Sequence, residues 1–173
     1  MRQVVTTTYY EVANQFQAVK LPYQGTKKNS MIIILPADGQ FRSFDNSFTI
    51  DQYNTIKEGL SRYEVTLTMP KFSYEWSASL IATLQSLGMV DAFDPLKADF
   101  SGINGNKPDL YISDVFHKSF VAVDEKGTEA AAATAIIIGL LSMPSKAAMT
   151  INRPFLFFIV NDDTGAILFM GPW

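Results

Sequence analysis

The pattern of hydrophobic and polar positions predicts strands over most of the first part of the chain. Three runs rich in β-branched and aromatic residues occupy 4–12, 16–23 and 31–36. The segment between the second and third runs contains Gly, Asn and Ser, which indicates a hairpin connection. The run Met31–Leu35 is apolar throughout, and this is typical of a strand that is buried on both faces.

Further strands are predicted from alternating or aromatic-rich runs later in the chain. They are expected at 63–76, 110–124, 151–160 and 167–170. Pro70 cannot donate to a ladder, so it should bend the first of these strands or lie where no donor is needed. Neither face of 110–124 is uniformly polar, which predicts a central strand that is partly covered on both sides. Residues 161–166 have the composition of a hairpin turn.

Two helices are predicted from apolar residues at helical spacing. The first covers 48–60, with Thr49 as its N-cap. The second covers 77–87, with Ser77 as a candidate cap and Gly88 just beyond its end. Dense Gly, Asp, Asn and Pro predict a loop at 94–109, and 142–149 is expected to be an exposed return segment.

The segment 125–142 joins two predicted strands, but its composition is not that of an ordinary loop. Ala and Ile predominate where loops favour Gly, Pro, Asn, Asp and Ser. A buried helix over Thr128–Leu141 capped by Thr128, a permanent core strand, and a membrane span all compete as explanations. A span would need about 20 residues, and Gly139 and Pro144 interrupt the apolar run before that length. We interpret the segment as a loop that has a second conformation available to it.

Composition narrows the classes of partner. The chain is 47% apolar with a formal net charge of −3, and it contains no block of Lys and Arg. These values argue against nucleic acid and anionic membranes as partners. The absence of cysteine excludes disulfides, thiolate metal sites and Cys nucleophiles, but it leaves the redox compartment open. The N-terminal residues lack the apolar core of a signal peptide.

Catalytic and metal chemistry finds little support in the sequence. His117 is the only histidine, so clusters of imidazole ligands are impossible, and no metal or cofactor is expected. A Ser–His–Asp triad from Ser113 or Ser119, His117 and Asp114 would need neighbours on one strand to converge, although adjacent residues point to opposite faces. A buried histidine bonded to nearby backbone is the expected alternative.

Several motifs together resemble the serpin family of protease inhibitors. The resemblance rests on the strings LTMPKFSYEWSASLIATLQSLGMVDAF, VFHKSFVAVDEKGTE, EKGTEAAAATA, INRPFLFFI and ILFMG, which occur in the order that the family has. It covers about the C-terminal half of a serpin. It implies an α+β fold with strands of the sheets that the family calls A, B and C, a few helices and an exposed reactive-centre loop at 125–145. Residues 1–173 are expected to form a single domain that lacks its N-terminal half.

The resemblance assigns a hinge to the start of that loop. For a loop to enter a formed sheet, its inward side chains must be small, and side chains alternate across a strand. Thr128, Ala130, Ala132 and Thr134 would point toward the interior, while the residues between them would point outward. The hinge residues are Glu125, Gly127, Thr128, Glu129, Ala130, Ala131, Ala132, Ala133 and Thr134.

The resemblance also implies the other functional positions. The family's hinge-to-bond length places the bond that a protease cleaves at Leu141–Ser142, with Met143 as an alternative. His117 matches a residue of the shutter, where the central sheet parts to admit the loop. The residues of the C-terminal signature are Asn152, Arg153, Pro154 and Phe155.

The function implied is that of a suicide-substrate inhibitor and not of an enzyme. An apolar residue before the bond suggests a chymotrypsin-like, elastase-like or cathepsin-type serine protease as the partner. The chain's own N-terminal half is a second expected partner. The expected location is extracellular or in the cell envelope, with the cytoplasm left open. The competing hypothesis is a non-inhibitory serpin-fold protein or an inactive fragment, and a hydrolase that uses His117 ranks below both.

Overall fold

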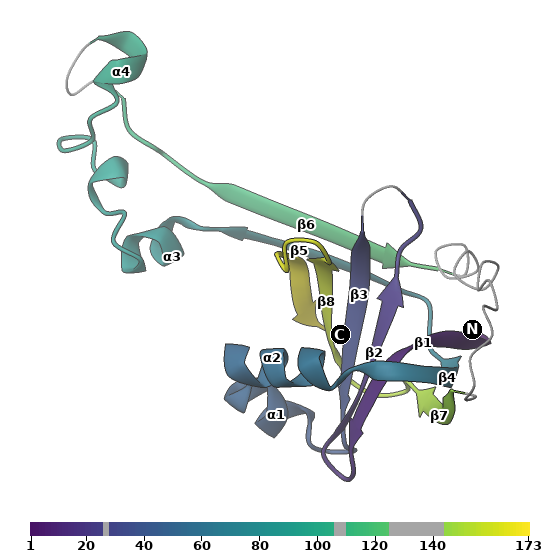
Figure 1. Cartoon of the computed structure of the whole chain (residues 1–173). Helices are drawn as coiled ribbons and strands as arrows, with labels where there is room; N and C mark the ends of the chain where they lie inside the picture. Colours follow the sequence, from purple (N-terminus) through teal and green to yellow (C-terminus); the bar gives the residue numbers. More distant parts are fainter. Residues whose placement is uncertain (26–27, 106–109, 125–143) are drawn as a thin grey trace. The chain divides into compact units, whose positions relative to one another are not determined.

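The computed structural model describes residues 1–25, 28–105, 110–124 and 144–173 (Figure 1). They separate into two compact units. The larger unit comprises Met1–Phe72 and Val123–Trp173, and the smaller unit comprises Ser73–Ala122. Both helices and strands are present, which confirms the predicted α+β class.

A seven-stranded sheet forms the larger unit, with strand order β7-β4-β1-β2-β3-β8-β9. Neighbouring strands are antiparallel except β4 and β7, which are parallel. The strands are β1 (Arg2–Val12), β2 (Phe16–Pro22), β3 (Asn29–Pro36), β4 (Ser61–Thr68), β7 (Ser145–Thr150), β8 (Leu156–Asn161) and β9 (Ile167–Pro172). The strands predicted in the first part of the chain and the hairpin between β8 and β9 are therefore confirmed.

The core lies along β3 and β8. Every side chain from Met31 to Leu35 is at most 3% exposed, which confirms the strand predicted to be buried on both faces. On one face, Ile32 and Ile34 pack with Tyr53 of α2 and Phe158 of β8. Aromatic residues fill this core because each buries a large apolar area.

Two helices pack on the sheet of the larger unit (Figure 1). The predicted helix is α2 (Ile50–Gly59), and Thr49 caps it as expected, in a capping box with Gln52. The helix α1 (Phe41–Ser47) was not predicted, because its N-cap Gln40 makes no side-chain capping bond. The spacing of Phe41, Phe44 and Phe48, which all pack on the core, is the signal that could have revealed it.

The predicted strand 63–76 is two strands. β4 ends at Thr68, whose partner on β1 is Arg2, and β5 (Phe72–Ser79) begins after Pro70. Pro70 thus lies where no ladder donor is required, as expected. The segment 142–149 also differs from the prediction, because Ser145–Thr150 form a strand and not a simple return. Its alanines have low β propensity, so the sequence pattern gave no sign of the pairing with β4.

In the smaller unit, β5 pairs with β6 (Phe116–Val123) in a two-stranded sheet. The unit also contains α3 (Ile81–Ser86), the 3-10 helix η1 (Asp91–Phe93) and α4 (Ser101–Asn104). The helix predicted from Ser77 is wrong at its start, because Ser77 belongs to β5 and α3 has Leu80 as its N-cap. The residues from Ser77 onward pair with the neighbouring strand segment instead of starting a helix. The Leu80 N–H still donates to the carbonyl of Val115, at 2.8 Å.

The expectation of a covered central strand at 110–124 is also wrong for the described residues. β6 begins at Phe116, and Val121 is its buried residue. The physical reason is that β5 is the one strand paired with β6 in the part of the chain that the structure describes. No helix among those residues has the length and hydropathy needed to cross a bilayer.

Candidate functional site

The segment that the sequence singles out connects β6 to β7. The predicted hinge residues Glu125, Gly127, Thr128, Glu129, Ala130, Ala131, Ala132, Ala133 and Thr134, and the predicted bond residues Leu141, Ser142 and Met143, lie outside the described residues. The strands on either side are described: β6 ends at Val123 and β7 begins at Ser145. These two strands flank the predicted site.

Side-chain contacts between β5 and β6 fix how the two strands pair. Ser79 donates to the carboxylate of Asp114 at 2.8 Å, and Glu75 forms an ion pair with Lys118. The rings of Trp76 and His117 lie 5.8 Å apart between these two contacts. As residue numbers increase along β5, the numbers of the residues that they contact decrease, so the two strands are antiparallel. This ribbon leads directly into the predicted hinge.

His117 is exposed on β6, so the expectation of a buried histidine is wrong. It contacts Trp76 with an angle of 54° between the ring planes, and this contact leaves the imidazole exposed. The carboxylate of Asp114 accepts hydrogen bonds from Ser79 and from the backbone N–H of Val115 instead of pairing with this imidazole. The structure thus does not assemble a Ser–His–Asp triad here. Among the described residues, no cluster of His, Cys, Asp and Glu is suited to hold a metal ion.

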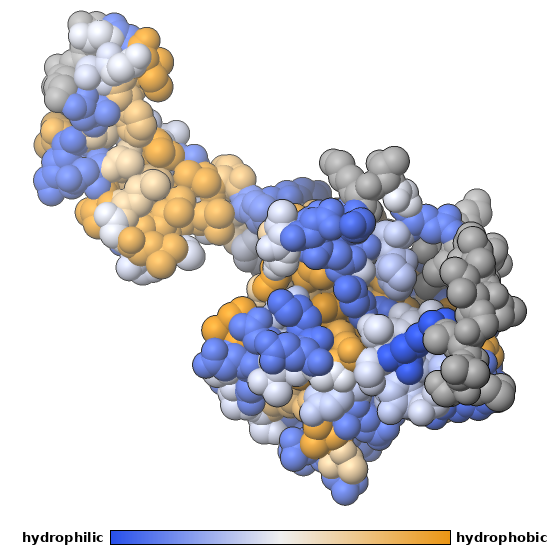
Figure 2. Space-filling view, viewed as in Figure 1, coloured by the Kyte–Doolittle hydropathy of each residue, from blue (hydrophilic) through white to orange (hydrophobic). Residues whose placement is uncertain are grey.

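The described residues of the smaller unit form almost no core of their own. Of its described residues, Ala98 and Val121 are the ones that are buried. Phe116 is 80% exposed and Phe120 is 59% exposed, both on β6. Figure 2 shows hydrophobic side chains gathered over this unit. A contiguous apolar surface of this kind is typical of a face that another polypeptide covers.

The predicted C-terminal signature, residues 152–155, lies between β7 and β8. The Arg153 Nε donates to the carbonyl of Pro36 at 2.8 Å. Phe155 is fully buried and exchanges two backbone hydrogen bonds with Trp173, each of 2.9 Å. Asn152 lies near the guanidinium of Arg153, and Pro154 separates these contacts from Phe155. In the described structure, Arg153 thus contacts the end of β3, and Phe155 contacts the residue that follows β9.

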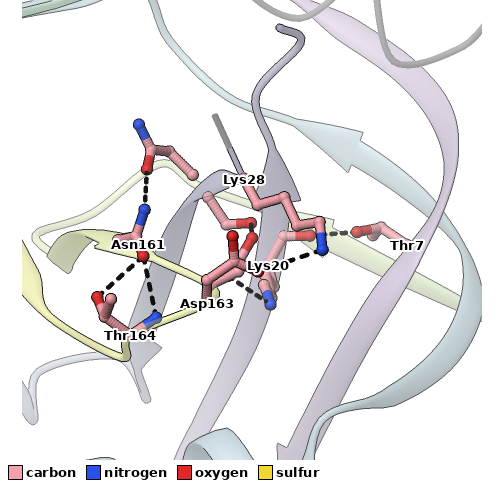
Figure 3. A network of polar contacts seen from close by, with 9 residues as sticks. Thr7, Lys20, Lys28, Asn161, Asp163 and Thr164 are labelled. Carbon is pink, nitrogen blue, oxygen red and sulfur yellow. Dashed lines mark hydrogen bonds and ion pairs between the residues drawn. The ribbon is translucent and has the colours of Figure 1, made fainter. Parts of the chain in front are cut away.

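A network of polar contacts connects β2 and β3 with the end of β8 and the residues that follow it (Figure 3). Asp162 lies 2.8 Å from the ammonium of Lys20 and accepts a 2.6 Å hydrogen bond from the buried hydroxyl of Ser30. Burial, and secondarily the charge of Asp162, raise the pKa of Tyr53. Neighbouring Asp163 pairs with Lys28 at 3.2 Å, where both side chains are well exposed. The carboxylates of Asp162 and Asp163 are thus paired with lysines of the same network, which indicates a structural role.

Replacing Asp162 by alanine is expected to lower the free energy of unfolding by about 2 kcal/mol, because it leaves the buried Ser30 hydroxyl without its acceptor. The matched change Asp163→Ala removes an exposed ion pair and should cost less than about 0.5 kcal/mol. Urea unfolding of both variants measures the difference. Equal losses would show that Asp162 does not hold β2 and β3 to the end of β8.

Comparison with known proteins covers the whole chain. A family model described as "Serpin (serine protease inhibitor)" matches residues 1–173. An uncharacterized serpin-like protein of Methanosarcina acetivorans is 39% identical over 170 residues, which are 98% of this chain and 39% of that protein. The leukocyte elastase inhibitor of Homo sapiens is 40% identical over 162 residues, which are 90% of this chain and 42% of that protein.

Two of the solved structures that match the chain are also serpins. The native-state structure of tengpin, a thermophilic serpin, matches 99% of this chain with a TM-score of 0.74 and 32% identity, and the match covers 44% of that chain. A tumour-suppressing serpin matches with a TM-score of 0.78 at 24% identity, which shows the fold alone. The chain therefore spans about two fifths of the length of the curated relatives that it matches.

Proposed function

The chain belongs to the serpin family, and on that premise we propose that it is the loop-bearing part of a suicide-substrate inhibitor of serine proteases. The observation that carries the proposal is the hinge sequence EKGTEAAAATA, which begins at the second residue after β6 ends. A relative 40% identical to the chain is named leukocyte elastase inhibitor, which also supports protease inhibition.

The proposed reaction begins as an ordinary proteolysis. The serine oxygen of the protease attacks the carbonyl carbon of Leu141, the bond to Ser142 breaks, and the amine of Ser142 leaves with a proton. The protease is now joined to Leu141 by an ester. The freed hinge then adds to the sheet beside β6 as a new strand; loop insertion in this family is a well-known case of strand addition. The inserting loop pulls the acylated protease along. The active site of the protease is distorted before water can hydrolyse the ester.

Two features of the described structure support insertion beside β6. This strand pairs with β5 alone among the described residues, so one of its edges is open to a further strand. It also exposes Phe116 and Phe120, whose burial by additional polypeptide would be favourable at about 25 cal/mol per Å² of apolar area. The hinge has the small side chains that entry requires.

We propose that the target protease has an apolar specificity pocket. Leu141, or Met143 if the bond lies there, would fill the pocket of a chymotrypsin-like, elastase-like or cathepsin-type enzyme. The nearest base, Lys146, belongs to β7 and pairs with Glu64 at 3.3 Å. This position makes a trypsin-like target the poorer candidate.

A second partner is the remainder of the family's chain, which the relatives carry and which makes up about three fifths of their length. The smaller unit buries two of its described residues, and such a unit needs another surface to be stable. We propose that this N-terminal part covers it and completes the sheet. By family analogy, the complete protein acts outside the cell or in the cell envelope, with the cytoplasm as the alternative.

The same observation favours a second candidate function. If the covering part is absent, the loop has no complete sheet to enter, and the polypeptide would be a non-inhibitory serpin-fold protein. Mixing the protein, with its N-terminal part where that exists, with chymotrypsin and running a denaturing gel separates the two. A covalent adduct that resists SDS supports inhibition. Clean cleavage near Leu141 with full remaining protease activity supports the non-inhibitory candidate.

A further inference from the structure

The sequence of β7 favours the strand conformation only weakly. β7 is an edge strand of the seven-stranded sheet, and β4, which runs parallel to it, is its one partner strand among the residues that the structure describes. Its residues are mostly exposed, with Met149 as the buried one, and its alanines have low β propensity. β7 begins four residues after Leu141, so this strand is close in sequence to the proposed cleavage bond.

A side chain from another part of the sheet reaches this strand. The amide nitrogen of Gln17 donates to the carbonyl of Ala148 in β7 at 3.2 Å. Gln17 belongs to β2, which is separated from β7 by β4 and β1 in the strand order. The contact is therefore not part of the ladder, and it gives β7 a second attachment besides β4.

The orientation of Gln17 is set by two neighbours. Its amide also donates to the hydroxyl of Tyr9 at 2.8 Å, and this hydroxyl donates to the carboxylate of Glu11 at 2.7 Å. Tyr9 is 3% exposed, and its ring packs edge-on against Tyr63 of β4 at 5.3 Å. Burial, and then the hydrogen bond with Glu11, raise the pKa of Tyr9, so the hydroxyl keeps its proton. A fixed hydroxyl is thus available to hold the Gln17 amide in place.

We propose that Gln17, oriented by Tyr9 and Glu11, is a positioning residue that holds β7 in the sheet and so fixes the C-terminal end of the reactive loop. The effect on inhibition rests on the proposed function, whereas the attachment of β7 does not. With Gln17 in place, the loop presents its bond to a protease from a fixed strand. Without it, the end of the loop moves with β7 and productive encounters become rarer.

The attachment is tested by hydrogen exchange in the protein without protease. Gln17→Leu removes the donor at similar size, and exchange of the β7 amides should become about fivefold faster, as expected for the loss of one hydrogen bond. Gln17→Lys keeps a donor opposite Glu11 and should restore slow exchange. Gln15→Leu, a change to the glutamine that lies two residues earlier in the turn before β2, should change nothing. Amides of β3 serve as the internal reference.

The positioning role is tested by the kinetics of capture. In Gln17→Leu, the rate of adduct formation with chymotrypsin should fall about threefold or more, while the ratio of adduct to cleaved inhibitor stays the same because the hinge is unaltered. Gln17→Lys should restore the rate. Unchanged β7 exchange in Gln17→Leu, or faster exchange with an unchanged capture rate, would overturn the proposal. If the unaltered protein forms no adduct, the inhibitor function fails, and the exchange result alone decides whether Gln17 holds β7.

Discussion

Replacing Thr128 by arginine is expected to convert the protein from an inhibitor of chymotrypsin into a substrate. In the proposed inserted strand, the side chain of Thr128 points into the protein, and an arginine there would bury an unpaired guanidinium. Leaving such a charge buried costs about 3 to 5 kcal/mol, so insertion should slow enough for water to release the protease first. The ratio of adduct to cleaved inhibitor should fall at least about a hundredfold.

The matched control for this change is Glu129→Arg. Residue 129 is the next along the hinge, and its side chain would point outward after insertion. This variant should still form the adduct, although it introduces the same group at the neighbouring position. Densitometry of denaturing gels at several inhibitor ratios measures both variants. If Thr128→Arg traps chymotrypsin as well as the unaltered protein does, the account of the hinge is wrong.

Replacing Leu141 by arginine is expected to redirect inhibition from chymotrypsin to trypsin. Trypsin has an aspartate at the base of its specificity pocket, whereas chymotrypsin has a hydrophobic slot. The rate of adduct formation with trypsin should rise at least about a hundredfold, and the rate with chymotrypsin should fall comparably. Leu141→Phe keeps an apolar residue and should retain chymotrypsin as the target.

A parallel variant, Met143→Arg, locates the bond independently. Whichever arginine creates trypsin inhibition marks the residue before the cleaved bond, and mass spectrometry of the released C-terminal fragment confirms it. Trypsin capture by Met143→Arg but not by Leu141→Arg would move the bond to the alternative position. Capture by neither variant would contradict the placement of the bond in this part of the loop.

The sequence predicted the larger unit well because local patterns there agree with the tertiary structure. The apolar run Met31–Leu35 is buried on both faces, and Thr49 caps its helix as its position suggested. Such agreement is expected where a segment's neighbours come from the same chain. The predicted serpin membership, which rested on motifs from most of the chain, is also confirmed.

The smaller unit was predicted less well, and the errors have a common cause. Ser77 has the features of a helix cap but belongs to β5, because β6 provides a strand to pair with. His117 was expected to be buried, yet it is exposed on β6 and Trp76 is the ring that contacts it. In the larger unit, the pairing of β7 with β4 was missed for a related reason, because Ala-rich segments carry little β signal. In each case, the presence or absence of pairing between distant segments determined the local structure. The local sequence pattern does not contain that information.

In the proposed mechanism, the reactive loop is kept out of a sheet that it would stabilise by joining. The most direct test is the melting temperature of the complete protein before and after a protease cuts the loop without remaining attached. If the cut hinge inserts, several kcal/mol of new strand pairing and burial should raise the melting temperature by more than about 10 °C, and the amides of β6 should exchange more slowly. An unchanged or lower melting temperature, with β6 exchanging as before, would contradict the claim.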